Sequence, residues 1–161
     1  MKIIKVLLAT SLLVLSGCGT LVQGENSSSV EEAYIVALDE LMKTDEALNH
    51  GQKFIAINME NFKLNEEKQQ KIVNYFSNQY NTKVKIATLE ELKEQGHFDE
   101  ETMSLDGVLL RFEEIDQKFS NKYVFKGHKF KSGLGAIWLT IEVKNNGEEW
   151  AVTESRMDAI S

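Results

Sequence analysis

The side chains able to do chemistry in this 161-residue chain are three histidines, many carboxylates and a single cysteine. His97 stands two residues before Asp99, and an imidazole and a carboxylate so placed can both ligate a divalent metal ion. The segment around them is rich in carboxylates, and such loops are usually solvated rather than metal-bound. We therefore expect no metal and no other cofactor, and keep His97 and Asp99 as weak metal candidates.

Recognisable catalytic nucleophiles are missing from the sequence after residue 18. It contains no Gly-x-Ser-x-Gly and no Ser-x-x-Lys. Cys18 is the only thiol, which excludes a disulfide, a zinc–thiolate site and a cysteine nucleophile from the rest of the chain. Adjacent glutamates point in different directions on a helix or strand and make no catalytic dyad by themselves. The sequence therefore gives no support for an enzyme, although a site assembled from distant residues stays open.

Trp138 and Trp150 are the candidate binding residues. In the segment around Trp138 the alternate positions Ile137 and Leu139 are apolar, so the indole should lie on the opposite face of a strand. Trp150 begins the next predicted strand, and the two rings together could form an aromatic patch that anchors a partner or ligand. In the alternative, a helix covers that face and both tryptophans belong to the core, as is usual for this residue type.

Hydrophobic periodicity predicts the elements that position these residues. An apolar stripe predicts a helix over residues 30–44, started by a capping box of Ser28 or Ser29 with the following glutamates. A buried strand over residues 53–59, a helix capped by Asn65 and an alternating strand over residues 83–87 follow, with Val84 and Ile86 inward. Thr88 and Glu91 form a second capping box for a helix over residues 89–95.

The second half of the chain is dominated by strands. After an irregular acidic segment over residues 97–106, alternation predicts strands over residues 108–115, 123–125, 134–144 and from 150 toward 155. Gly127-His128 is interpreted as a turn, and Asn145-Asn146-Gly147 as a hairpin. An N-terminal helix, a strand-helix-strand unit and a C-terminal antiparallel sheet together predict a single α+β domain.

Composition is ordinary for a soluble globular protein, with 42% hydrophobic and 27% charged residues. The length fits one domain with a proper core. The formal net charge of −7 disfavours binding to nucleic acid, because an acidic domain is repelled by phosphate. We therefore expect no nucleic-acid partner.

The first eighteen residues have the pattern of an export signal. Lys2 and Lys5 precede a mostly apolar run over residues 6–15, and the small residues Ser16 and Gly17 then lead to Cys18. The run is too short for a spanning helix, which needs about 20 apolar residues. A cationic start, a short apolar run and small residues at the cleavage site are typical of a signal peptide.

The order Leu-Ser-Gly-Cys resembles the lipobox of bacterial lipoproteins, and the whole chain resembles small uncharacterised lipoproteins of Bacillus-type bacteria. This resemblance implies cleavage after a signal peptide over residues 1–17 and a diacylglycerol thioether on Cys18. Residues 18–29, with their glycines and serines, would then be a tether, and residues 30–161 the domain. Two acyl chains would hold the domain at the outer surface of the membrane.

We expect a lipid-anchored extracytoplasmic binding or interaction module that serves an envelope or transport complex. Its partners would be the membrane, through acylated Cys18, and a protein or small molecule that the sequence does not identify. Two alternatives stay open. One is a cell-surface hydrolase with a site not visible in the sequence, and the other is a small solute-binding component.

Overall fold

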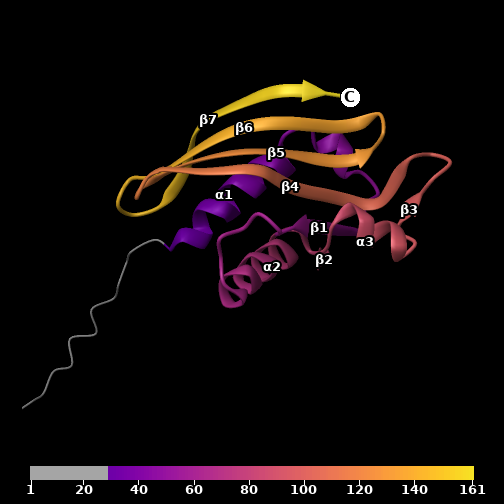
Figure 1. Ribbon diagram of the computed structural model, residues 1–161, viewed down its shortest axis with the longest axis horizontal. Coiled ribbons are helices and arrows are strands. Elements are labelled where there is room, and N and C mark those ends of the chain that lie inside the picture. The colour runs from indigo at the N-terminus through magenta and orange to yellow at the C-terminus, as the bar shows by residue number, and fades with distance from the viewer. Residues whose placement is uncertain (1–28) are drawn as a thin grey trace, which may run out of the picture.

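A seven-stranded mixed sheet organises the computed structural model, which describes residues 29–161 (Figure 1). The strands follow the spatial order β2-β1-β4-β5-β6-β7, and β3 pairs with β4 outside this path. Their bounds are β1 Phe54–Asn58, β2 Lys83–Ile86, β3 Phe98–Asp99, β4 Ser104–Phe119, β5 Lys122–Ser132, β6 Gly135–Asn145 and β7 Trp150–Ile160. The helices are α1 Val30–Lys43, α2 Glu66–Tyr80, α3 Leu89–Glu94 and the short 3₁₀ helix η1 Glu46–Asn49.

The strand pairing confirms the predicted α+β class. Strand β1 is parallel to both β2 and β4, and α2 provides the crossover between β1 and β2. From β4 to β7 the chain forms an antiparallel meander. The predicted strand-helix-strand unit and C-terminal antiparallel sheet are therefore two parts of one sheet.

Capping residues start two of the helices as the sequence predicts. The Asn65 side chain accepts a hydrogen bond of 3.0 Å from the backbone N–H of Lys68 at the start of α2. Thr88 and Glu91 form a complete capping box at α3. The box predicted for α1 is wrong, because the Ser29 hydroxyl donates to the Glu32 carboxylate and accepts no backbone N–H.

Both α1 and α2 pack on one face of the sheet, where the main core lies. Figure 1 shows α1 lying along strands β4 to β7. The largest buried side chains of this core include Tyr34, Leu38, Leu41, Ile55, Ile57, Phe76, Phe112, Phe125 and Ile141. On the opposite face, Leu92 of α3 covers only a small cluster with Phe54, Ala56, Leu105 and Leu109. We call the remainder of that second face, on strands β4 to β7, the open face, because no helix of residues 29–161 packs on it.

Three local predictions are wrong. The segment 97–106 is not irregular, since Phe98 and Asp99 form β3 and pair with the start of β4. Ile86 is 53% exposed rather than inward, because it ends the edge strand β2. Gly127 is no turn but lies within β5, where a Cβ atom would come within 2.6 Å of the Phe112 ring. The glycine therefore marks a close approach between two strands.

Lys129 of β5 is completely buried at the end of α1. Its Nζ donates to the backbone carbonyls of Met42, Thr44 and Asp45 at 3.1, 2.6 and 2.9 Å, and to Asn49 Oδ1 at 3.1 Å. The last carbonyls of a helix lack partners within the helix. Lys129 supplies these partners and ties α1 and η1 to the sheet.

Candidate functional site

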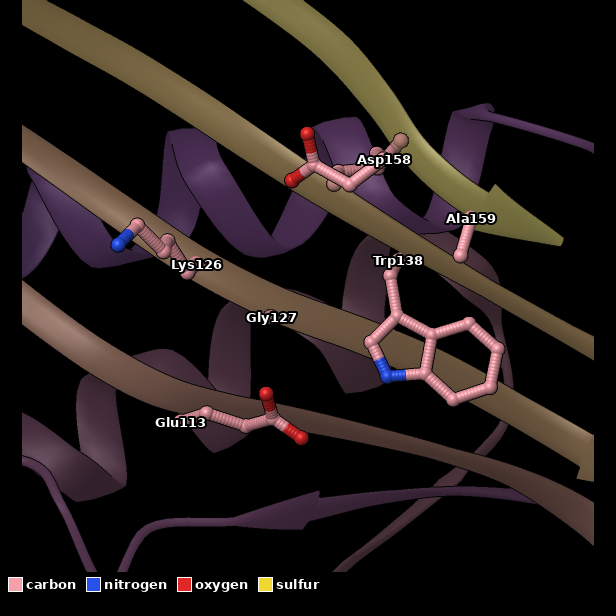
Figure 2. A pocket seen from close by; sticks show the side chains of 7 residues that line it. Glu113, Lys126, Gly127, Trp138, Asp158 and Ala159 are labelled. Atoms are coloured by element: carbon pink, nitrogen blue, oxygen red, sulfur yellow. The ribbon is translucent and has the colours of Figure 1, made fainter.

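A hollow of about 350 Å³ lies on the open face and is the candidate site (Figure 2). Strands β4, β5, β6 and β7 all contribute to it. Its lining residues are Glu113, Lys126, Gly127, Trp138, Leu139, Asp158 and Ala159. The half-buried indole of Trp138 is the one aromatic side chain of this lining and is seen beside the Glu113 carboxylate in Figure 2.

Strand register places the central residues of the site in one row. Arg111 of β4 lies opposite His128 of β5, which lies opposite Trp138 of β6, and Ala159 of β7 completes the row. The centroids of the His128 and Trp138 rings are 5.7 Å apart. Directly opposed residues of neighbouring strands share a face of the sheet, so the row is a consequence of the hairpin registers.

Both acidic residues of the hollow are the extra residues of β-bulges. Phe112 pairs with Gly127 and Glu114 with Lys126, which leaves Glu113 unpaired in β4. The pairing of β6 with β7 skips Asp158 in the same way. A bulge bends its strand and re-aims the side chain of the extra residue. The hollow is thus bordered on two sides by re-aimed carboxylates, with Trp138 between them.

The charged side chains around the hollow are unequally satisfied. Lys126 Nζ donates to Glu114 at 2.7 Å, and Asp158 accepts from Thr140 Oγ1 at 2.6 Å and from Arg156 Nε at 3.0 Å. Lys126 and Asp158 therefore each have an oppositely charged partner among the described residues. The Glu113 carboxylate, by contrast, is half-exposed and faces the hollow, and its one polar side-chain neighbour among the described residues is the imidazole of His128.

His128 and Arg111 carry buried nitrogens without a well-formed hydrogen bond. His128 Nδ1 lies 3.2 Å from Glu113 Oε1, but in poor geometry for a hydrogen bond, and Arg111 Nε has no partner among the described residues. Burial lowers the pKa of His128 below its ordinary value, the Arg111 charge adds to this effect, and Glu113 opposes it. The lowered pKa favours the neutral form of the imidazole. Unsatisfied buried donors are costly, and a bound polar group would relieve that cost.

Only one of the two predicted tryptophans belongs to this site. Trp150 is 7% exposed and packs in the main core, with its ring 5.6 Å from that of Tyr123. The predicted joint patch is wrong, because the chain turns over residues 146–149 and Trp150 pairs with Asn145. Asn145 shares the core-facing side of β6 with Val143, so Trp150 points to the core and Trp138 away from it.

The two weak metal candidates are occupied by other contacts. Lys85 Nζ donates to His97 Nε2 at 2.8 Å, and the Asp99 carboxylate accepts the backbone N–H groups of Glu101 and Thr102 in the turn after β3. Within residues 29–161 no three His, Cys, Asp or Glu side chains gather as a metal site. Cys18 lies outside the described residues.

No pattern in the sequence identifies most residues of the hollow as members of one site. Alternation does place Arg111 and Glu113 on the face opposite Phe112, as the structure has them. The bulges that present Glu113 and Asp158 follow from pairing between distant strands. From the sequence, His128 was interpreted as a turn residue because a glycine precedes it, whereas the structure places both residues within β5.

Comparison with known proteins adds nothing to this geometry. No model of a known protein family, no curated protein and no solved structure matches the chain. A function for the hollow therefore has to be argued from its own residues and from the N-terminal pattern.

Proposed function

We propose that this chain is a lipid-anchored binding module facing outside the cytoplasm, and that the hollow around Trp138 is its contact surface. A protein of an envelope or transport complex is the partner class that fits best. Anchoring would keep the hollow close to such a complex in the same membrane.

The N-terminal pattern supports the anchor. Lys2, Lys5, the apolar run over residues 6–15 and the order Leu-Ser-Gly-Cys ending at Cys18 resemble a lipoprotein signal. Among the described residues no helix is long and apolar enough to cross a membrane. Two acyl chains on Cys18 would give stable attachment, whereas a single chain gives only marginal binding.

The observation that carries the binding function is the environment of Trp138. A half-buried indole lines a hollow on a helix-free face together with the half-exposed carboxylate of Glu113. Tryptophan is among the residue types most enriched at the energetic anchors of protein interfaces. A side chain needed only for the core would face α1, as Trp150 does.

Photo-crosslinking from the rim of the hollow tests this function. A benzoylphenylalanine at Ala159, in the full chain expressed in its native host, should give one discrete adduct with a membrane-associated protein. The same group at Ser120, exposed in the β4–β5 turn, is the matched control and should give no such adduct. The additional substitution Trp138→Ala should reduce the Ala159 adduct at least tenfold, since anchor residues contribute about 2 kcal/mol or more.

A thermal melt of Trp138→Ala should show that the domain still folds, because the indole is outside the main core. An Ala159 adduct that persists unchanged in folded Trp138→Ala, or equal adducts from Ser120 and Ala159, would contradict the proposed contact surface.

One observation favours a hydrolase as a second candidate function. Burial lowers the pKa of His128, which favours the neutral imidazole, and its Nδ1 lies 3.2 Å from the Glu113 carboxylate, an arrangement that can orient an imidazole as a general base. The volume of the hollow also falls at the lower end of small-molecule pockets, which keeps a small solute as a ligand class. Hydrolysis of chromogenic esters that is lost in both His128→Gln and Glu113→Gln would favour the hydrolase over the binding module.

A further inference from the structure

We propose that β7 is a dimerisation edge, at which two copies of this chain join their sheets antiparallel around a two-fold axis through Ser155. β7 ends the strand order, and no described strand pairs with its outer side. Ten of its eleven residues are at least partly exposed, including Met157 at 47% and Ile160 at 65%. This inference is independent of the hollow and of the anchor.

An edge of this kind is a template for another strand. It presents a row of backbone N–H and C=O groups that pair readily with a further chain. Short strands, prolines, bulges and charged side chains protect an edge from such pairing. The chain contains no proline, and the bulges of β7 at Thr153 and Asp158 leave residues 154–157 as a regular stretch between them. By comparison, the other sheet edge, β2, is only four residues long. β7 is therefore the edge with the greater capacity to add a strand.

Symmetry restricts the register of such a pairing. Directly opposed residues in antiparallel strands point to the same face, so a two-fold axis through the sheet must place one residue opposite its own copy. Ser155 is the midpoint of Trp150–Ile160 and lies in the regular stretch of β7 between the bulges at Thr153 and Asp158, so a register centred there pairs this stretch with its own copy. A centre at Met157 would leave the first four residues of the strand unpaired.

Charge selects the same register. With Ser155 at the centre, Glu154 lies opposite the partner's Arg156, and the pair occurs twice by symmetry. A centre at Glu154 or at Arg156 would instead place two like charges face to face. Opposite charges directly across a strand pair are stabilising and like charges destabilising.

Within one copy, Glu154 has an unfavourable environment that this pairing would relieve. It lies opposite Glu142 of β6 and forms no ion pair with any described residue. Lys122, the cation that pairs with Glu142, lies 2.7 Å from the Glu142 carboxylate and forms no ion pair with Glu154. Arg156 bonds Asp158 but its side chain stays 67% exposed, so in a dimer it remains accessible to Glu154 of the partner subunit.

Disulfide trapping tests the two-fold axis. The full chain carrying Cys18→Ser has no thiol, so a single cysteine can be introduced at any chosen position of β7. Opposed residues of an antiparallel pair have Cα atoms about 4.5–5.5 Å apart, which suits a disulfide. In nonionic detergent, Ser155→Cys should form a disulfide-linked dimer on mild oxidation. The control Ala151→Cys is equally exposed on β7 but would lie about 26 Å from its copy, and should stay monomeric.

Charge reversal tests the register. Arg156→Glu should weaken the dimer measured by sedimentation velocity about tenfold, because two attractive pairs become repulsive. The double substitution Glu154→Arg with Arg156→Glu restores both pairs and should restore the dimer. Equal trapping of Ser155→Cys and Ala151→Cys would overturn the axis. A dimer indifferent to Arg156→Glu would overturn the register.

Discussion

Replacing Lys129 with methionine is expected to lower the free energy of unfolding by about 2 kcal/mol at pH 7. Methionine fits the buried space but cannot donate to the carbonyls of Met42, Thr44 and Asp45, which end α1 and lead into η1. Burying an ammonium is itself costly, so the loss is smaller than four separate hydrogen bonds would give. Urea unfolding of both proteins at pH 7 measures the difference.

The pH dependence of that difference identifies its cause. Burial lowers the pKa of Lys129 to about 8, with Asp45 and Glu46 opposing the effect. Between pH 8 and the ordinary pKa of 10.5 the unfolded chain holds a proton that the folded protein has released, so folding becomes more favourable as pH rises. The stability advantage of the wild type over Lys129→Met should therefore grow by roughly 1.4 kcal/mol per unit from pH 8 to pH 10.

Lys144→Met, at an exposed position of β6, is the control and should change stability by less than about 0.5 kcal/mol. Two results would contradict this role of Lys129 at the end of α1. One is a Lys129→Met protein as stable as the wild type at pH 7, and the other is a difference in free energy of unfolding that shrinks toward pH 10.

The second large effect is expected at Glu31, whose substitution by glutamine should cost about 3 kcal/mol at pH 7. Its side chain is 3% exposed and lies 3.0 Å from Lys71 Nζ and 3.3 Å from Lys68 Nζ of α2. Burial acts to raise the pKa of this carboxyl, but its own backbone N–H and the two lysines outweigh burial and lower the pKa to about 2. The pair of lysines therefore attaches α2 to the start of α1.

Acid titration gives the sign of this contribution. A carboxyl whose pKa falls on folding stabilises the protein fully above its unfolded value of 4.5, and that stability is lost as pH falls from 4.5 toward 2. Unfolding free energies at pH 7, 5 and 3 should therefore fall less steeply for Glu31→Gln than for the wild type. Glu32→Gln, at an exposed neighbour, is the control. Parallel acid profiles for Glu31→Gln and the wild type would contradict the role of this ion pair.

Much of the fold could be predicted because its signals are local. The apolar stripe of α1, the Asn65 cap and the capping box at Thr88 each depend on residues within one or two turns. Strand alternation identified β4 and β6 for the same reason, although β4 is longer in the structure than predicted and β6 is shifted by one residue. Pairing partners such as β3 and β4 depend on contacts between chain segments and left no comparable pattern.

The candidate site was harder to predict from the sequence than the fold, and the reason is physical. Glu113 and Asp158 enter the hollow through bulges, which are decided by how four strands pair rather than by either residue. Trp150 was misplaced because the sequence does not give the register of β7 against β6: Trp150 pairs with Asn145, which shares the core-facing side of β6 with Val143. Trp138 was placed correctly, since its neighbours Ile137 and Leu139 fix its face.

Attachment of the binding module to a membrane through Cys18 is tested most directly by the mass of the N-terminal peptide of the protein extracted from membranes. The proposed function predicts a peptide that begins at Cys18 and carries the added mass of a diacylglycerol group. A peptide that retains residues 1–17, or one with an unmodified Cys18 thiol, would contradict the lipid anchor.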